Sequence, residues 1–259
     1  ALLARCLEAL GRIGLDHPEI EAIDVNPMIV AGGQPVAVDA LVTLVGPPQA
    51  ELAATAAAAA DDPPPVATLE GFFSPRSVVV VGASATPGKP GCEVVRNLLD
   101  NGYPGTLYLV NPKGERILGR QVHRSIGDLP RGIDQAVIVL PARLVPQAVR
   151  ECAAQGIGCL VLAAGGFAEV DAAGAALQEQ TLQAIRQTGV RVLGPNTAGH
   201  VSTPARFTSS FFRLGPVPSG RVSFIAQTGN FVTHTLRYLA TGEHVGVARV
   251  VGVGNKLDV

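Results

Sequence analysis

Glycine, hydroxyl and lysine residues directly follow one apolar run, in a pattern suited to holding phosphate. Gly82, Ser84, Thr86 and Lys89 come after the β-branched run 77–81. A glycine allows a tight turn out of a strand, and the N–H groups and dipole of a following helix start favour an anion. The spacing is not G-x-G-x-x-G, so a glycine turn that serves only packing is the alternative. The loop nevertheless predicts phosphate binding.

A cation and a proline follow the next two apolar runs. The run 106–110 ends in Asn111-Pro112-Lys113, where an NAD-binding unit would carry an acidic residue. A lysine there suits a phosphorylated ribose, as in NADP or the 3′-phosphate end of coenzyme A, and a solvated turn lysine is the alternative. Pro141, after the third run, offers a smooth surface to an adenine or a pantetheine arm.

A parallel sheet is needed to bring these residues to one edge. The fold class predicted is α/β, with a doubly wound, Rossmann-like parallel sheet. Its expected strands are 77–81, 106–110, 135–140, 159–163 and 191–193, with helices after residue 91 and at 143–155 and 173–188. A second unit begins with a strand at 221–225, a turn at 226–230, a helix at 231–241 and a strand at 245–253. Before the sheet, the pattern predicts a helix over 2–14 and a hairpin of strands 20–30 and 35–45.

Composition excludes several classes of protein. The 259 residues include 20 Lys and Arg against 21 Asp and Glu, so the chain lacks the basic surplus expected of a protein that binds nucleic acid or an anionic membrane. No apolar stretch is long enough to span a membrane. The four cysteines form no CxxC pair, and with no secretory signal this predicts a reducing cytoplasm. Ala1 lies inside a helical pattern and Val259 follows a strand-like run, so we expect a piece of a larger polypeptide.

Several motifs occur in one order over roughly 70–259: FFSPRSVVVVGASATPGKPG, NLLDNGYPGTLYLVNPK, VIVLPA, GGFAE and GPN. Together they resemble the CoA-binding domain of NDP-forming acyl-CoA synthetases, relatives of the succinyl-CoA synthetase α subunit. The resemblance implies that the glycine loop and Lys113 bind the diphosphate and 3′-phosphate, that Pro141 and the turn at 164–165 line the pantetheine, and that Asn196 lies near the thiol. The implied CoA contacts are Gly82, Ser84, Ala85, Thr86, Pro87, Lys89, Lys113, Pro141, Ala164, Gly165 and Asn196.

The chain departs from the family pattern at two places. Thr197 stands where a cysteine commonly follows Gly-Pro-Asn. The second strand–helix turn has Ala226 where the family's Ser-Gln-Ser-Gly-like sequence has its first serine. Because Thr228 keeps a hydroxyl at the helix start, we expect Gln227, Thr228 and Gly229 to hold a phosphate.

The N-terminal part has its own resemblance. AIDVNPMIV followed by VAVDA is similar to the closing hairpin of an ATP-grasp domain. It implies that Asn26 and Asp39 hold Mg²⁺ against ATP or ADP phosphates, and oxygen ligands suit that ion; an ordinary hairpin with a polar rim is the alternative. The expected domains are an ATP-grasp end at 1–46, a linker at 47–68, the CoA-binding domain at 69–200 and the start of a flavodoxin-like ligase domain at 201–259.

The function expected is part of an acyl-CoA synthetase that interconverts acyl-CoA, NDP and phosphate with carboxylate, CoA and NTP. A phosphohistidine is expected beyond Val259, with structural or surface roles for His17, His123, His200, His234 and His244. The alternatives are a CoA-sensing regulatory module of a protein lysine acetyltransferase and an NADP-dependent oxidoreductase or nucleotide-sensing module. Expected partners are CoA, a small carboxylate or acyl-CoA, and a nucleotide through the ATP-grasp domain; no nucleic acid or membrane is expected, and assembly into a homo-oligomer stays open.

Overall fold

The computed structural model contains two compact units, 1–63 and 64–259. Within them the described residues are 2–25, 28–31, 34–37, 40–44, 67–114, 116–241 and 245–258. No helix among these residues is long and apolar enough to cross a membrane.

The N-terminal unit is a helix with a paired ribbon of strands. Its elements are α1 (Leu2–Asp16), β1 (Ile20–Val25), β2 (Met28–Ala31), β3 (Gln34–Ala37) and β4 (Ala40–Leu44). β2 pairs with β3 and β1 with β4, both antiparallel. The pairs Met28–Ala37 and Val25–Ala40 belong to one hairpin register. The predicted helix and hairpin are therefore confirmed.

The second unit opens with a helix that the sequence pattern did not predict. α3 (Ala67–Phe73) occupies the last two positions of the expected linker, 47–68, and five residues beyond it. It is short and contains a glycine, so its propensity is weak. Phe72 explains it, because this side chain is only 4% exposed and packs with Val78 and Cys159 of the neighbouring sheet. Burial of the Phe72 ring thus stabilises a helix that the local sequence does not predict.

The centre of this unit is a five-stranded sheet in which every strand is parallel to its neighbours, as predicted. Its strands are β5 (Ser77–Val81), β6 (Thr106–Val110), β7 (Gln135–Ile138), β8 (Cys159–Leu162) and β9 (Arg191–Leu193). The order is β6-β5-β7-β8-β9, so the direction of winding reverses between β5 and β7. In such sheets ligands bind at the carboxyl ends of the strands at that point.

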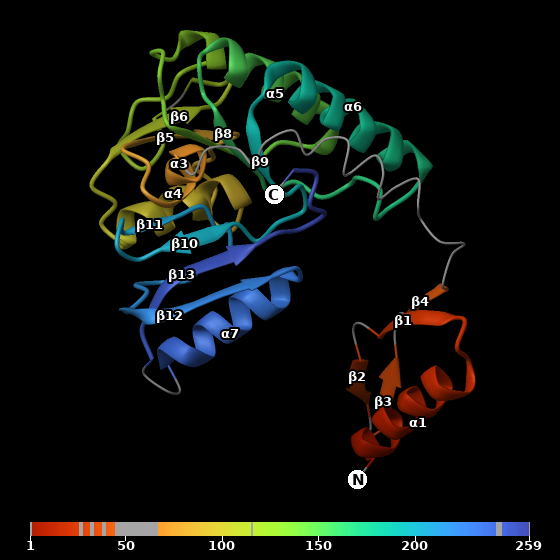
Figure 1. The fold of residues 1–259 in the computed structure, drawn as a ribbon. Coiled ribbons are helices and arrows are strands. Elements are labelled where there is room, and N and C mark those ends of the chain that lie inside the picture. The colour runs from red at the N-terminus through yellow and green to blue at the C-terminus, as the bar shows by residue number, and fades with distance from the viewer. Residues whose placement is uncertain are drawn as a thin grey trace. The chain divides into compact units, whose positions relative to one another are not determined.

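Helices cover both faces of the sheet because each strand buries side chains on both sides. The helices are α4 (Pro90–Asp100), α5 (Val145–Ala154) and α6 (Ala172–Thr188), with 3₁₀ turns at Ile126–Asp128 and Ala142–Leu144. Val79 and Val81 pack in the cluster that contains α5 and α6, whereas Val78 and Val80 pack with α3 and α4. Figure 1 shows the two pairs of helices on opposite faces. The uninterrupted valine run is the signature of such a strand.

A second, mixed sheet follows. It contains β10 (His200–Ser202), β11 (Phe207–Thr208), β12 (Ser219–Ala226) and β13 (Val247–Gly252) in the order β11-β10-β13-β12, with α7 (Gly229–Thr241) packed on it. β12 and β13 are parallel, but β10 is antiparallel to both of its neighbours. The sequence predicted β12, α7 and β13 as the start of another doubly wound unit. It missed β10 and β11, which are short and do not follow a helix, and they make the sheet mixed.

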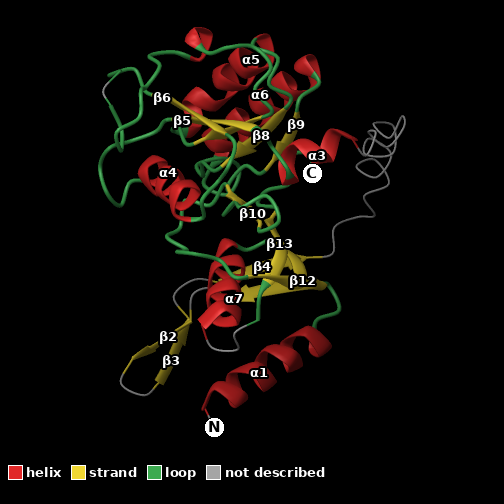
Figure 2. Cartoon of the chain, turned by 90° about the vertical axis from the view of Figure 1, so that its left-hand side faces the viewer, coloured by secondary structure: helices red, strands yellow, loops and turns green. Residues whose placement is uncertain are grey.

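Side-chain amides join the two sheets. Asn97 of α4 is fully buried, and its Nδ2 donates to the Ser210 carbonyl oxygen over 2.9 Å. Asn101 accepts a hydrogen bond from the backbone N–H of Val217 over 3.1 Å. The segment between β11 and β12 therefore lies against α4, and both sheets belong to one compact unit (Figure 2).

Candidate functional site

The candidate site lies at the carboxyl edge of the parallel sheet, where the loops after β5, β6, β7, β8 and β9 emerge. Two glycines shape the first of these loops. Gly82 has a φ of +91°, which side chains rarely adopt. A Cβ on Gly91 would overlap the carbonyl oxygen of Gly82. α4 can therefore begin directly against the end of β5, as a phosphate-binding strand–helix turn requires.

The N–H groups of this loop divide into engaged and free ones. Thr86 N–H donates to Ser84 Oγ over 3.1 Å, and Gly88 N–H donates to Glu93 Oε1 over 2.8 Å. The N–H groups of Ser84 and Ala85 have no acceptor among the residues that the structure describes. The predicted anion site is therefore narrower than the whole loop. It consists of the free N–H groups of Ser84 and Ala85 beside the start of α4, where the Gly91 N–H also has no acceptor among the described residues.

Two exposed lysines flank these groups. Lys89 is the residue before α4, with Pro90 following as its first residue, and Lys113 lies in the turn after β6. Neither forms an ion pair within the described part of the chain. Asn111 connects the two loops, because its Nδ2 donates to the Ala83 carbonyl over 2.7 Å and its Oδ1 accepts from Lys113 N–H over 2.9 Å. Sequence reasoning gave Asn111 no role, although its place directly after a strand was a usable signal.

The loops after β8 and β9 meet at the same edge. Asn196 N–H donates to the Ala164 carbonyl over 2.8 Å, and a Cβ on Gly165 would lie 3.2 Å from Asn196 Oδ1. Asn196 is exposed and has a φ of +54°. The structure therefore brings together three residues that were predicted to lie along the pantetheine and near the thiol. Pro141 is exposed after β7, at the start of the next 3₁₀ turn.

Glu169 holds the turn that follows β8. Its Oε1 accepts hydrogen bonds from Gly166 N–H over 2.7 Å and from Phe167 N–H over 3.1 Å, while Oε2 accepts from Asn255 Nδ2 over 2.7 Å. Desolvation by itself would raise the pKa of Glu169, but the hydrogen bonds from Asn255, Phe167 and Gly166 outweigh it and keep the pKa below its ordinary value. Glu169 is therefore an anion that fixes backbone rather than a proton acceptor. Sequence reasoning missed it.

The second predicted phosphate site adjoins the Asn196 turn. Gln227 and Thr228 are exposed, and α7 begins at Gly229. A Cβ on Gly229 would lie 3.3 Å from the Cβ of Ala198, so the start of α7 packs against the residues after Asn196. The helix start and its dipole can attract an anion there.

Thr197, which stands where the family commonly has cysteine, is buried in the same turn. Its hydroxyl donates to the Gly252 carbonyl and accepts from Gly199 N–H over 3.0 Å. The side chain thus ties the turn to β13. Its oxygen is already engaged, which gives Thr197 a structural role.

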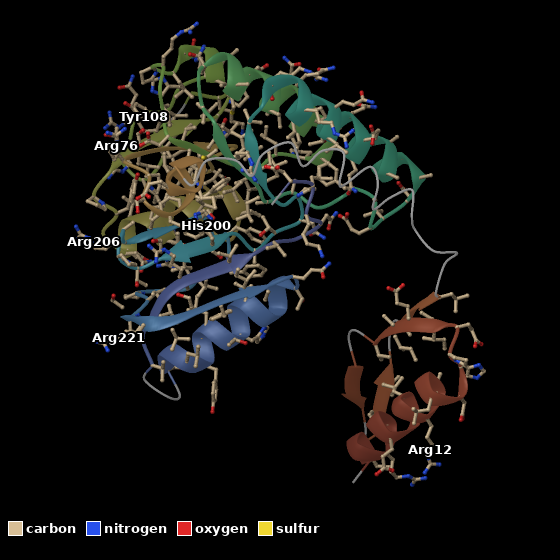
Figure 3. The ribbon with its side chains drawn as sticks, viewed as in Figure 1. Arg12, Arg76, Tyr108, His200, Arg206 and Arg221 are labelled. Atoms are coloured by element: carbon tan, nitrogen blue, oxygen red, sulfur yellow. The ribbon has the colours of Figure 1, made fainter. Side chains whose placement is uncertain are left out.

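His200 is also structural, as expected. The ring is fully buried, with Nε2 2.6 Å from the Phe72 carbonyl oxygen and Nδ1 2.8 Å from Ser209 Oγ. Burial lowers the pKa of His200 to about 4, although the hydrogen bond to Phe72 acts in the opposite direction. Figure 3 shows His200 in the interior, whereas Arg206 and Arg221 are at the surface. A neutral, doubly hydrogen-bonded ring is unsuited to carry a phosphoryl group.

The expected magnesium ligands, Asn26 and Asp39, lie outside the described residues, as does His244. Among the residues that are described, no three His, Cys, Asp or Glu side chains are grouped in a way that could hold a metal ion. The cysteines in the described part are free thiols.

Residues 76–202 match the protein family described as a CoA binding domain. With its parallel sheet, this region is thus a CoA-binding domain of the α/β class. The chain is 35% identical over 247 residues to acetate–CoA ligase [ADP-forming] II of Archaeoglobus fulgidus, which covers 95% of this chain and 35% of the relative. It is 39% identical over 196 residues to the α subunit of acetate–CoA ligase [ADP-forming] I of Pyrococcus furiosus, covering 74% of this chain and 42% of the relative.

A solved structure agrees with these similarities. The apo form of dinucleotide forming acetyl-coenzyme A synthetase 1 from Ca. Korarchaeum cryptofilum superposes with a TM-score of 0.68 at 36% identity, over 74% of this chain and 41% of that one. The chain belongs to the NDP-forming acetate–CoA ligase family and carries its CoA-binding domain. It spans between about a third and two fifths of the length of these two curated relatives.

Proposed function

We propose that this chain supplies the CoA-binding part of an acyl-CoA synthetase that interconverts acyl-CoA, NDP and phosphate with carboxylate, CoA and NTP. The observation that carries the proposal is the carboxyl edge of the parallel sheet. Two free N–H groups, at Ser84 and Ala85, lie beside the start of α4, with the exposed cations Lys89 and Lys113 in the flanking positions. Anionic groups of CoA suit this combination of helix start and cations.

The proposal assigns one part of CoA to each loop. The diphosphate lies on the N–H groups of Ser84 and Ala85, and Lys113 pairs with the 3′-phosphate. The pantetheine then runs past Pro141 and the 164–165 turn, which leaves the thiol near Asn196. That order follows the sheet from β6 across β5 and β7 to β8 and β9.

The thiol end is also the place where a phosphate would be needed. An acyl phosphate transfers its acyl group to the thiol with release of phosphate, so the two sites must be neighbours. The packing of Gly229 against Ala198 supports this arrangement, because it places the start of α7 beside the Asn196 turn. Thr228 would add a hydroxyl donor to that phosphate site.

The N-terminal hairpin is proposed as the end of an ATP-grasp domain. The similarity to the Archaeoglobus fulgidus ligase supports this, because 247 matched residues extend well into the first unit. The assignment of Mg²⁺ to Asn26 and Asp39 rests on the sequence motif, and no catalytic step is derived from it.

The experiment that tests CoA binding measures CoA, NADP and dephospho-CoA on the unmodified chain and on the variants Lys113→Ala and Arg131→Ala. CoA at about 100 times its Kd should stabilise the protein by about 2.7 kcal/mol, whereas NADP should leave the unfolding midpoint unchanged. Lys113→Ala should weaken CoA about fivefold, since an exposed ion pair contributes on the order of 1 kcal/mol. The same substitution should leave dephospho-CoA binding unchanged.

Arg131→Ala is the matched control, because this exposed cation lies in the loop that enters β7 at the opposite edge of the sheet. Arg131→Ala should change neither the affinity for CoA nor the affinity for dephospho-CoA. Equal losses for CoA and dephospho-CoA on Lys113→Ala would reject the 3′-phosphate assignment. Stabilisation by NADP in preference to CoA would reject the proposed function and favour a nicotinamide cofactor.

A further inference from the structure

At the carboxyl edge, a glutamate carboxylate accepts a backbone N–H group of the loop after β5, and another accepts two such groups of the loop after β8. Glu93 of α4 is only 8% exposed and accepts the Gly88 N–H of the glycine loop over 2.8 Å. Glu169 accepts the N–H groups of Gly166 and Phe167 in the loop after β8. In both loops a glycine with positive φ, Gly88 or Gly166, is the residue that is held.

Each carboxylate also meets a group from the mixed-sheet part of the unit. Arg213, between β11 and β12, has its Nε 4.0 Å from Glu93 Oε2 and pairs in addition with Asp100. Asn255, after β13, donates from Nδ2 to Glu169 Oε2 over 2.7 Å. One oxygen of each carboxylate therefore faces a ligand-binding loop and the other faces the mixed sheet.

This arrangement limits the motion of both loops, more firmly at Glu169, whose second oxygen accepts a hydrogen bond, than at Glu93, whose second oxygen has an ion pair at 4.0 Å. A glutamate that is bonded through one oxygen can still rotate, and a loop held by it can follow. When the second oxygen is fixed by a separate element, the side chain and the loop lose that freedom before the ligand arrives. Because the loops are already ordered in the free protein, their loss of freedom no longer reduces the affinity for CoA.

Neither carboxylate is placed to contact CoA as a binding group. Glu93 carries a negative charge near the start of α4, where it would repel a diphosphate. Arg96 of the same helix, 3.9 Å from Glu93 Oε1, and Arg213 offset that charge. The contacts made by Glu93 and Glu169 are to backbone and to neighbouring side chains, so any effect on CoA acts through the loops.

We infer that Glu93 and Glu169 are positioning residues for CoA, through which the docked mixed sheet, by Arg213 and Asn255, preorganises the two loops that receive the diphosphate and the pantetheine. The inference rests on the proposed function, since it takes CoA as the ligand of these loops. It adds that the mixed sheet raises CoA affinity from a distance, by a contact with each carboxylate.

The test is a double-mutant cycle on CoA affinity, measured by isothermal titration calorimetry with the 259-residue chain. Glu169→Ala and Asn255→Ala should each weaken CoA about tenfold, and the double variant should be no weaker than Glu169→Ala alone, because both substitutions remove the same fixation. Glu179→Ala, at an exposed position of α6, is the control and should bind CoA like the unmodified chain.

Glu93→Gln tests the other loop. The amide oxygen can still accept the Gly88 N–H but loses the charge that faces Arg213, so we expect a loss of about threefold, against about tenfold for Glu93→Ala. Unfolding midpoints recorded on the same samples separate affinity from stability. If an alanine variant does not fold, the corresponding glutamine variant, which keeps an acceptor, takes its place in the comparison.

Folded variants of both glutamates that bind CoA within twofold of the unmodified chain would overturn the inference. So would a double variant whose loss is the product of the two single losses, because Asn255 would then act independently of Glu169. An unmodified chain that does not bind CoA at all would overturn the proposed function, and this inference with it.

Discussion

Acid should destabilise the second unit through one buried histidine. The pKa of His200 is about 4 in the folded protein, whereas an unfolded histidine titrates near 6.5. Below pH 6.5 the unfolded state therefore binds a proton that the folded state does not, and the free energy of unfolding falls as the pH falls towards 4. Above pH 6.5 the ring is neutral in both states and contributes no pH dependence.

The size of the effect follows from the separation of the two pKa values. Each unit of separation corresponds to ~1.36 kcal/mol, so the full loss between pH 6.5 and 4 is about 3 kcal/mol. Phe72, Phe73 and Phe207 surround the ring, and no carboxylate is hydrogen-bonded to it in the described part of the chain. The Phe72 carbonyl favours the imidazolium ion, but desolvation of the buried ring outweighs it.

The measurement is urea unfolding of the unmodified chain and of His200→Gln, followed by circular dichroism from pH 7.5 to 4. Glutamine can donate from its amide to the Phe72 carbonyl but does not titrate. At pH 7.5 the variant should be less stable, because ring contacts are lost, and the difference should shrink by about 3 kcal/mol as the pH approaches 4.

Carboxylates such as Asp134 and Glu169 also make stability depend on pH, but their contribution is the same in both proteins. The difference between the two curves therefore isolates His200. A difference that stays constant from pH 7.5 to 4 would refute the reasoning and show that the folded protein accommodates the charged ring.

Three further outcomes are expected. Gly91→Ala should lower stability by about 2 kcal/mol or more and CoA affinity at least tenfold, because its Cβ would overlap backbone. Gly158→Ala, whose Cβ position is open, should leave CoA affinity unchanged in the same calorimetric titration. Asp134→Asn should cost about 1–2 kcal/mol of unfolding free energy at pH 7. Although burial raises the pKa of Asp134, hydrogen bonds from the N–H groups of Arg76 and Ser77 keep it below its ordinary value. This contribution is therefore present above the unfolded pKa, and the stability curves of the two proteins should converge as the pH falls through the lowered folded pKa. Thr228→Val should weaken inorganic phosphate, measured by ³¹P line broadening, about threefold to tenfold, since one hydroxyl donor is lost; an unchanged phosphate affinity would remove Thr228 from that site.

The parallel sheet could be read from the sequence because its strands carry their own signal. The valine run of β5 and the glycine turn after it are local features, whereas the strand order came only from the structure. β10 and β11 were not predicted because they are only three and two residues long and, unlike the equally short β9, do not follow a helix in the strand–helix alternation. α3 was missed for a related reason, because its helix is fixed by what Phe72 packs against and not by the residues beside it.

The same distinction separates the predicted from the missed site residues. Ser84, Thr86 and Lys113 were predicted because hydroxyl and lysine side chains after a strand indicate phosphate. Glu169 acts through the backbone of a neighbouring turn, and its partner Asn255 is 86 residues further along the chain. Such a pair has no local pattern, so only the folded structure could show it.

The buried amide of Asn97 sets a limit on how this domain can be exchanged between proteins. The matched family region ends at residue 202, but the carbonyl oxygens that Asn97 donates to belong to Ser210 and Phe212. A chimera cut at the family boundary would leave a buried amide with two unsatisfied donors, at a cost of about 1–3 kcal/mol. It would also strip Phe207 from the core. The segment that can be inherited, recombined or grafted as one piece therefore extends beyond the region that sequence similarity outlines, at least to Val217, whose N–H bonds Asn101.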